Sequence, residues 1–275
     1  MSPQVGEIDQ EAFDALMRED PGAAMELVVD MTKATDETLR EKARRLAGTI
    51  LLERSKVGPS RARGSSKLRL RPADRGGDLD VDASMAALVE ARASNLPAHL
   101  EDLQAVDWAQ PGIALCLLVD TSGSMTGGRL AAAALTAAAC SWRAPEEFAV
   151  VSFEREATVQ RGLHQPTPPE TLVDQLLALR GHGVTGLSAA MRSAADQLAA
   201  ARSSRRVTVL LSDCRSTDDK DPIPLAASLD ELLILAPADD SSDAEALAAA
   251  VGARVETMAD PSEAAAALAR LLDAS

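Results

Sequence analysis

The chain has 275 residues, of which 46% are hydrophobic and 25% charged, a balance typical of a folded globular protein and not of a disordered one. Its 42 acidic residues outnumber its 28 basic residues, and it contains no Tyr, three Phe and two Trp. This composition argues against a general nucleic-acid-binding protein, because such proteins neutralise phosphates with basic side chains and stack bases on aromatic rings.

The first ten residues are acidic and lack the basic flank and the apolar run of a signal peptide. No uninterrupted apolar stretch approaches the roughly 20 residues that cross a bilayer. The three cysteines, Cys116, Cys140 and Cys214, show no CxxC spacing and are most simply explained as reduced thiols. We therefore expect a cytoplasmic protein that does not contact membranes.

Charge is unevenly distributed, and this divides the chain. Residues 54–75 contain eight basic residues and one acidic residue, whereas the segments on either side are acidic. Because this stretch also contains two Gly- and Ser-bearing turns, we predict a basic loop or linker. We expect three regions: a helical N-terminal region (1–57), a basic linker with a short helix (58–109) and a larger domain (110–275).

The N-terminal region has the pattern of helices. Pro21 suits the first turn of a short helix. Thr35 is predicted to cap a second helix, in which apolar residues recur at helical spacing and end before Gly58. A further helix is predicted over residues 80–93, inside the linker region.

From about residue 110 the pattern changes to strands that alternate with helices. Continuous apolar runs predict buried strands at residues 113–119, 148–153, 207–211 and 232–235. Shorter strands are predicted at residues 157–159 and 254–257. Helices are predicted at residues 129–143, 169–180, 187–202, 242–251 and 261–273. This alternation predicts an α/β fold, with a doubly wound, mostly parallel sheet covered by helices on both faces and preceded by the smaller helical region.

Three loops at the predicted carboxyl ends of the strands carry oxygen ligands. Open α/β sheets bind ligands at this edge, where neighbouring loops converge. Taken singly, each loop is better explained by helix capping, so the prediction of a site depends on the coincidence of all three. Two carboxylates and three hydroxyls suit a hard cation such as Mg²⁺, and Mn²⁺ or Ca²⁺ accept the same ligands. The candidate metal ligands are Asp120, Ser122, Ser124, Thr185 and Asp213.

The sequence Leu117-Leu-Val-Asp-Thr-Ser-Gly-Ser-Met125, together with Thr185 and Asp213, resembles a von Willebrand factor A domain with a metal-ion-dependent adhesion site. The resemblance covers about residues 110–275. It implies that an Asp or Glu of a partner protein completes the coordination of the ion, so that the metal bridges two proteins. It also implies direct binding by Ser122 and Ser124, direct or water-mediated binding by Thr185, and mainly water-mediated binding by Asp120 and Asp213.

Two positions depart from the usual pattern of this family. Cys214 stands where a Gly usually follows the last Asp, and Gly186 stands where an Asp or Asn often follows the Thr. Neither position removes one of the candidate ligands. We expect both to affect the shape of the loops and the choice of partner.

The region ahead of the domain narrows the resemblance. An intracellular chain with this organisation is similar to the bacterial A-domain proteins that accompany MoxR-type AAA+ ATPases, a wider group that includes CoxE-like and magnesium-chelatase D-type proteins. The resemblance implies an adaptor that couples the ATPase to protein remodelling or to metal-cofactor insertion, with the ATPase or its client as the partner. The chain has no GxxxxGK[ST] motif, so we do not expect it to be an ATPase itself.

We therefore expect a non-catalytic, divalent-metal-dependent protein–protein interaction protein, and two alternatives stay open. A haloacid-dehalogenase-like phosphatase would also place Asp120 beside Mg²⁺. Its chemistry needs a second carboxylate two residues later as general acid, and Ser122 occupies that position. An extracellular adhesin would use the same A domain, and the missing signal peptide and the unpaired cysteines argue against it.

Overall fold

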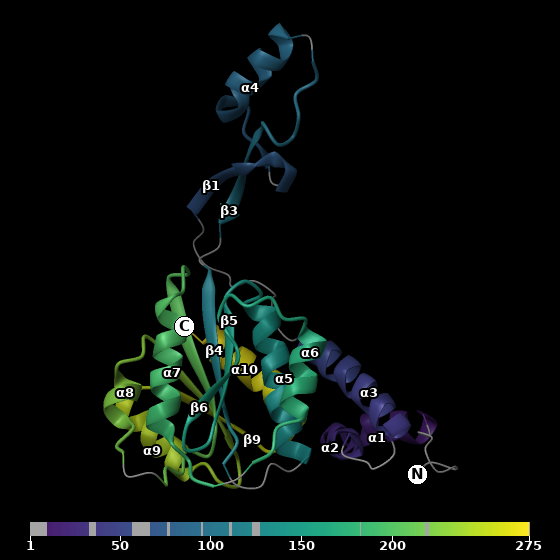
Figure 1. The fold of residues 1–275 in the computed structure, drawn as a ribbon, viewed down its shortest axis with the longest axis vertical. Helices are drawn as coiled ribbons and strands as arrows, with labels where there is room; N and C mark the ends of the chain where they lie inside the picture. Colours follow the sequence, from purple (N-terminus) through teal and green to yellow (C-terminus); the bar gives the residue numbers. More distant parts are fainter. Residues whose placement is uncertain are drawn as a thin grey trace. The chain divides into compact units, whose positions relative to one another are not determined.

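The computed structural model describes residues 10–32, 37–56, 67–75, 78–94, 96–109, 112–122, 127–181, 183–217 and 220–274. The chain divides into two compact units, one within Met1–Ser60 and Ile113–Ser275 and the other within Arg61–Gly112 (Figure 1). The N-terminal helices therefore belong to the same unit as the α/β domain.

The larger unit is built around a six-stranded sheet with the order β6-β5-β4-β7-β8-β9. All neighbouring strands are parallel except β5 and β6, which are antiparallel. The apolar sequences of the central strands explain why both faces of the sheet are covered. The strands are β4 (Ile113–Asp120), β5 (Phe148–Phe153), β6 (Ala157–Arg161), β7 (Arg205–Leu211), β8 (Leu232–Pro237) and β9 (Arg254–Met258).

Helices cover both faces of this sheet, as the sequence predicts. Alternate residues of β4 enter opposite layers: Leu117 packs in the core with α5, α6 and α10, and Leu118 in the core with α7, α8 and α9. The predicted helix ends agree with the observed ones to within three residues, and the five-residue α8 was not predicted. The helices are α5 (Gly127–Arg143), α6 (Pro169–Leu177), α7 (Leu187–Ala199), α8 (Ile223–Ala227), α9 (Ser242–Val251) and α10 (Ala264–Asp273), the last preceded by the 3₁₀ turn η2 (Pro261–Glu263).

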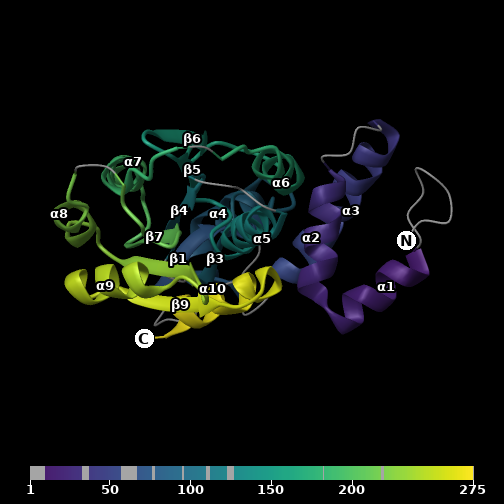
Figure 2. The same cartoon turned by 90° about the horizontal axis from the view of Figure 1, so that it is seen from below.

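The N-terminal helices are α1 (Gln10–Glu19), α2 (Pro21–Met31) and α3 (Glu37–Ser55). Both α2 and α3 contact α5, and α3 also contacts α6 (Figure 2). As a result, every residue from 130 to 140 in α5 is buried. A helix covered on all sides must be apolar around its whole circumference, which explains the alanine-rich sequence of α5. The predicted cap Thr35 lies outside the described residues.

The smaller unit contains an antiparallel sheet with the order β1-β3-β2 and the helix α4. Its elements are β1 (Lys67–Pro72), η1 (Ala73–Arg75), β2 (Asp78–Leu79), α4 (Val81–Ala93) and β3 (Gln104–Ala109). The helix predicted at 80–93 is confirmed, and the Asp80 carboxylate caps it by accepting the backbone N–H of Ala83 at 2.9 Å.

The prediction that residues 54–75 form a loop or linker is wrong for residues 54–55, which end α3, and for the strand at residues 67–72. Residues 67–72 alternate basic and apolar side chains, which is the period of a strand, and β1 pairs with β3 along its whole length. The charge and the turn residues of the stretch obscured that period. Residues 57–66 of the stretch lie outside the described part of the chain. Of the helices that the structure describes, none combines the length and the apolarity needed to span a membrane.

Candidate metal centre

Asp120 and Asp213 come to one edge of the sheet because β4 and β7 are adjacent and parallel. Val119 pairs with Leu211, so the residues that follow the two strands are neighbours. The chain leaves β4 through α5 on one face of the sheet and reaches β7 through α7 on the other. The candidate site therefore lies at the topological switch point of the sheet, where open α/β folds bind their ligands.

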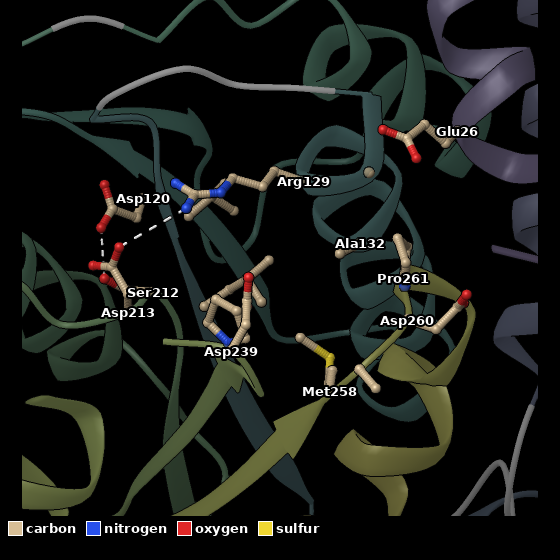
Figure 3. A pocket seen from close by; sticks show the side chains of 15 residues that line it. Glu26, Asp120, Arg129, Ala132, Ser212, Asp213, Asp239, Met258, Asp260 and Pro261 are labelled. Carbon is tan, nitrogen blue, oxygen red and sulfur yellow. Dashed lines mark hydrogen bonds and ion pairs between the residues drawn. The ribbon is translucent and has the colours of Figure 1, made fainter. Parts of the chain in front are cut away.

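Both carboxylate oxygens of Asp120 accept hydrogen bonds. Oδ1 accepts the backbone N–H of Ser122 at 2.9 Å and its hydroxyl at 2.6 Å. Oδ2 accepts the hydroxyl of Ser212 at 2.5 Å (Figure 3). Burial raises the pKa of Asp120; the hydrogen bonds from Ser122 and Ser212 oppose this shift, and the charge of Asp213 adds to it. The carboxylate is thus fixed in position, and a nearby cation would favour its ionised form.

Thr185 joins this group through its hydroxyl. The Oγ1 atom of Thr185 lies 2.5 Å from the Oγ atom of Ser122, and both residues are buried. The loop that carries Thr185 is held on both sides. The backbone N–H of Thr185 donates to the Thr217 hydroxyl at 2.8 Å, and the backbone N–H of Gly186 donates to the carbonyl of Glu154 at 2.6 Å.

Asp213 lies beside these residues and has two different neighbours. Its Oδ1 atom accepts the backbone N–H of Arg215 at 3.0 Å. Its Oδ2 atom lies 4.0 Å from the guanidinium of Arg129, which extends from the first turn of α5 (Figure 3). The Arg215 side chain pairs with Asp240 at 2.7 Å and so ties this loop to the segment before α9.

Four of the five predicted ligands are therefore brought together: Asp120, Ser122, Thr185 and Asp213. The fifth, Ser124, lies outside the described residues. Neighbouring ligands of an octahedral Mg²⁺ are about 3 Å apart when the metal–oxygen bonds are near 2.1 Å. The Ser122 hydroxyl lies 2.6 Å from the Oδ1 atom of Asp120 and 2.5 Å from the Thr185 hydroxyl; these are hydrogen-bond distances, and they place three oxygen atoms within reach of one ion. The donor set of carboxylates and hydroxyls fits a hard divalent cation.

Within the described residues, no group of three or more His, Cys, Asp and Glu side chains could hold a metal ion. A centre of the kind predicted here depends on serine and threonine hydroxyls as much as on carboxylates. The chemistry of the donor set, and not a cluster of charged ligands, is therefore the observation that favours a metal.

The structure places one departure from the usual family pattern in a backbone conformation that favours glycine and explains the other by a close approach of the backbone. Cys214 has a φ angle of 62°, in the left-handed region that glycine adopts without strain. At Gly186, a Cβ atom would lie 2.5 Å from the backbone carbonyl oxygen of Arg155. Asp or Asn therefore does not fit at Gly186 unless the loop at residues 154–155 moves.

Three residues at the site were not predicted as part of it: Ser212, Thr217 and Arg129. Ser212 directly precedes Asp213 at the end of β7, which is a weak positional signal. Thr217 gives no signal, because its contact with Thr185 depends on how two loops fold together. Arg129 does give a signal in the sequence. A basic residue in the first turn of a helix is unfavourable beside the helix dipole, and its presence there indicates a nearby anion.

A cavity of about 380 Å³ opens beside the two aspartates. Asp120, Asp213 and Arg129 line one side of it, and Glu26 of α2 and Asp260, which precedes η2, line another (Figure 3). An N-terminal helix therefore contributes to the cavity that adjoins the candidate metal centre.

Comparison with known proteins finds a family model that matches part of this chain. Residues 115–215 match the family model of the von Willebrand factor type A domain. A comparison with curated proteins finds no match. Solved structures with a similar fold include an aerotolerance-related membrane protein from Bacteroides fragilis, with 13% identity, a TM-score of 0.49, and coverage of 60% of this chain and 100% of that one.

Two further solved structures are similar over the same part of the chain. A von Willebrand factor type A protein from Catenulispora acidiphila is 19% identical, with a TM-score of 0.48, and 61% of this chain covers 43% of it. Proximal thread matrix protein 1 from the mussel byssus is 15% identical, with a TM-score of 0.50, and 59% of this chain covers 46% of it. At these identities the likeness concerns the fold alone. Together with the family model, the sheet and its switch point support a von Willebrand factor A domain in this chain.

Proposed function

We propose that this protein is a non-catalytic, divalent-metal-dependent interaction protein, whose A domain binds a carboxylate of a partner protein. The single observation that carries the proposal is the convergence of the Asp120 carboxylate with the Ser122 and Thr185 hydroxyls, next to Asp213, at the carboxyl edge of the sheet. The ligands would be these four residues and Ser124, with Mg²⁺ as the ion and Mn²⁺ or Ca²⁺ as substitutes.

Each residue of the candidate metal centre would have a distinct role. Ser122 and Thr185 offer neutral hydroxyl oxygens, and Asp120 orients Ser122 through two hydrogen bonds. Ser212 fixes the second oxygen of Asp120. Bound to such a set, Mg²⁺ supplies an electrophilic centre that accepts an Asp or Glu oxygen from the partner. Because few of the direct ligands are charged, the ion would keep much of its positive charge for the partner.

The engagement of both Asp120 oxygens supports binding over catalysis. A nucleophilic aspartate, as in the phosphatase alternative, needs a free oxygen and a general acid nearby, and Ser122 stands where that acid would be. We propose a MoxR-type AAA+ ATPase, or the client of such an ATPase, as the partner in the cytoplasm. The N-terminal helices support an adaptor role because α2 lines the cavity beside the site.

The test is an affinity capture from native lysate with three full-length baits: wild type, Asp120→Ala and Asp239→Ala. Asp239 lines the same cavity and is exposed, so its variant removes one carboxylate but none of the predicted ligands. Each bait is used with Mg²⁺ and with EDTA, and the captured proteins are identified by mass spectrometry.

We expect an AAA+ ATPase to be captured by wild type and by Asp239→Ala with Mg²⁺, and to be lost with EDTA or with Asp120→Ala. Capture of the ATPase under all conditions would keep the adaptor role and contradict the metal bridge. If no bait captures a specific partner, the adaptor proposal fails, and metal-dependent hydrolysis of an aryl phosphate becomes the next activity to measure.

A further inference from the structure

We propose that Arg129 is a built-in cation of the candidate metal centre and that it lowers the affinity of the site for divalent ions. This inference rests on the metal-dependent function proposed above. It assigns to one residue, outside the predicted ligand set, the role of setting how readily the site takes up its ion.

The position of Arg129 is the first observation. Its guanidinium lies 4.0 Å from the Oδ2 atom of Asp213, and its side chain reaches from α5 toward Asp120 and Asp213 (Figure 3). The side chain is 48% exposed, whereas that of Asp213 is 15% exposed. Arg129 is therefore the more exposed partner of this pair.

The helix that carries Arg129 gives the second observation. Arg129 stands in the first turn of α5, which has no acidic residue there. The positive end of the helix dipole disfavours a cation at this position. The carboxylates at the switch point are the neighbouring charges that compensate for this unfavourable placement.

The third observation concerns the oxygen atoms that remain available. Asp213 already uses Oδ1 to accept the backbone N–H of Arg215. Its Oδ2 atom lies 4.0 Å from the guanidinium, so an ion at the site, or a water bound to that ion, would share this oxygen with Arg129. An ion at the site would compete with the guanidinium for Oδ2 and would be repelled by its charge.

The size of the effect follows from Coulomb's law. A single charge that lies near a divalent ion, in water at moderate salt, changes the affinity for that ion by roughly three- to tenfold. We therefore expect Arg129→Gln to bind Mn²⁺ three to ten times more tightly than wild type. Arg129→Lys keeps the charge and is expected to stay within about twofold of wild type.

The experiment measures Mn²⁺ binding to the full-length protein by the loss of the free-Mn²⁺ signal in electron paramagnetic resonance. Arg202→Gln is the matched control, because Arg202 is exposed and precedes β7 at the opposite edge of the sheet. Any Mn²⁺ binding that remains in Asp213→Ala is binding outside the candidate metal centre. Circular dichroism and a thermal melt of each variant verify that it is folded.

Tighter binding by Arg129→Gln, with Arg129→Lys and Arg202→Gln near wild type, supports the inference. Equal affinities for wild type and Arg129→Gln, with no Mn²⁺ binding in Asp213→Ala, overturn the inference and leave the metal site intact. An equal gain in Arg129→Gln and Arg202→Gln also overturns it, because net charge alone then explains the change. If wild type and Arg129→Gln both fail to bind Mn²⁺, the metal-dependent function is contradicted, and this inference falls with it.

Discussion

The loop after β7 places a side chain where the backbone conformation favours glycine. Cys214 has a φ angle of 62°, and its thiol is buried against the core next to α7, α8 and α9. Burial raises the pKa of this thiol to about 12, and the charges of Asp120 and Asp213 add to the shift, so Cys214 is a neutral thiol near pH 7. Two opposing contributions therefore act at this residue: packing of the sulfur, which stabilises the loop, and backbone strain, which destabilises it.

Cys214→Gly and Cys214→Ala separate these contributions. Both variants lose the sulfur, but only Gly relieves the strain of a left-handed backbone, which costs an L-residue about 1 kcal/mol. We expect the free energy of unfolding of Cys214→Gly to exceed that of Cys214→Ala by about 1 kcal/mol, as measured by urea denaturation. The opposite order would show that the backbone at position 214 is not strained.

At the scale of the elements, hydrophobic periodicity predicts the larger unit well. The apolar runs of β4, β5, β7 and β8 have no other stable place than the centre of a covered sheet. In the smaller unit the helix was predicted but the sheet was not, because β1 consists of alternating basic and apolar residues and pairs with β3, which was not predicted. Strand formation there depends on partners that are distant in sequence, and local composition suggested a linker.

The candidate site also has a part that could be predicted from the sequence and a part that could not. Its ligands could be predicted because Asp120 is the last residue of β4 and Asp213 lies two residues after β7, and adjacent parallel strands place such residues together. The support from Ser212 and Thr217 could not be predicted, because each depends on how one loop folds against another. Sequence alone also gave no indication that α2 lines the cavity beside the site.

The contact between α2 and η2 depends on a glycine. A Cβ atom at Gly22 would lie 1.6 Å from an Asp260 carboxylate oxygen, and this carboxylate accepts the backbone N–H of Ser262 at 2.7 Å. Gly22→Ala must displace Asp260 and break this cap, so we expect a loss of about 1–2 kcal/mol in the free energy of unfolding. Chemical denaturation of the full-length variant measures this change.

Gly48 provides the control. It lies inside α3, and a Cβ atom there would have no neighbour within 4 Å. Gly48→Ala should therefore stabilise the protein by about 0.5–1 kcal/mol, because alanine has the higher helix propensity. Stabilisation of Gly22→Ala as well as of Gly48→Ala would contradict the contact described for Gly22.

At the scale of the molecule, the N-terminal helices share one hydrophobic core with the α/β domain. Leu51 of α3 is fully buried in the cluster that also contains α5 and β4. The chain has two tryptophans, and they report on different units: Trp142 lies in α5 and Trp108 in β3. The unfolding of each unit can thus be followed separately by fluorescence.

We expect Leu51→Ala to destabilise the larger unit by about 3 kcal/mol, the typical cost of a cavity in a core. In a Trp108→Phe background, the transition reported by Trp142 should move to lower urea concentration. In a Trp142→Phe background, the transition reported by Trp108 should stay in place. An equal shift of both transitions would show that the two units unfold as one.

The burial of α5 on all sides also constrains how this sequence can change during evolution. The outward alanines of an ordinary surface helix face water and can be replaced by larger polar residues. In α5, the corresponding residues lie between the sheet and the N-terminal helices, so a larger side chain would force two layers apart. We expect relatives that keep the N-terminal helices to keep apolar residues around the whole circumference of this helix, like the buried leucines and alanines here. Relatives that lack those helices are free to place charged residues on its outer face.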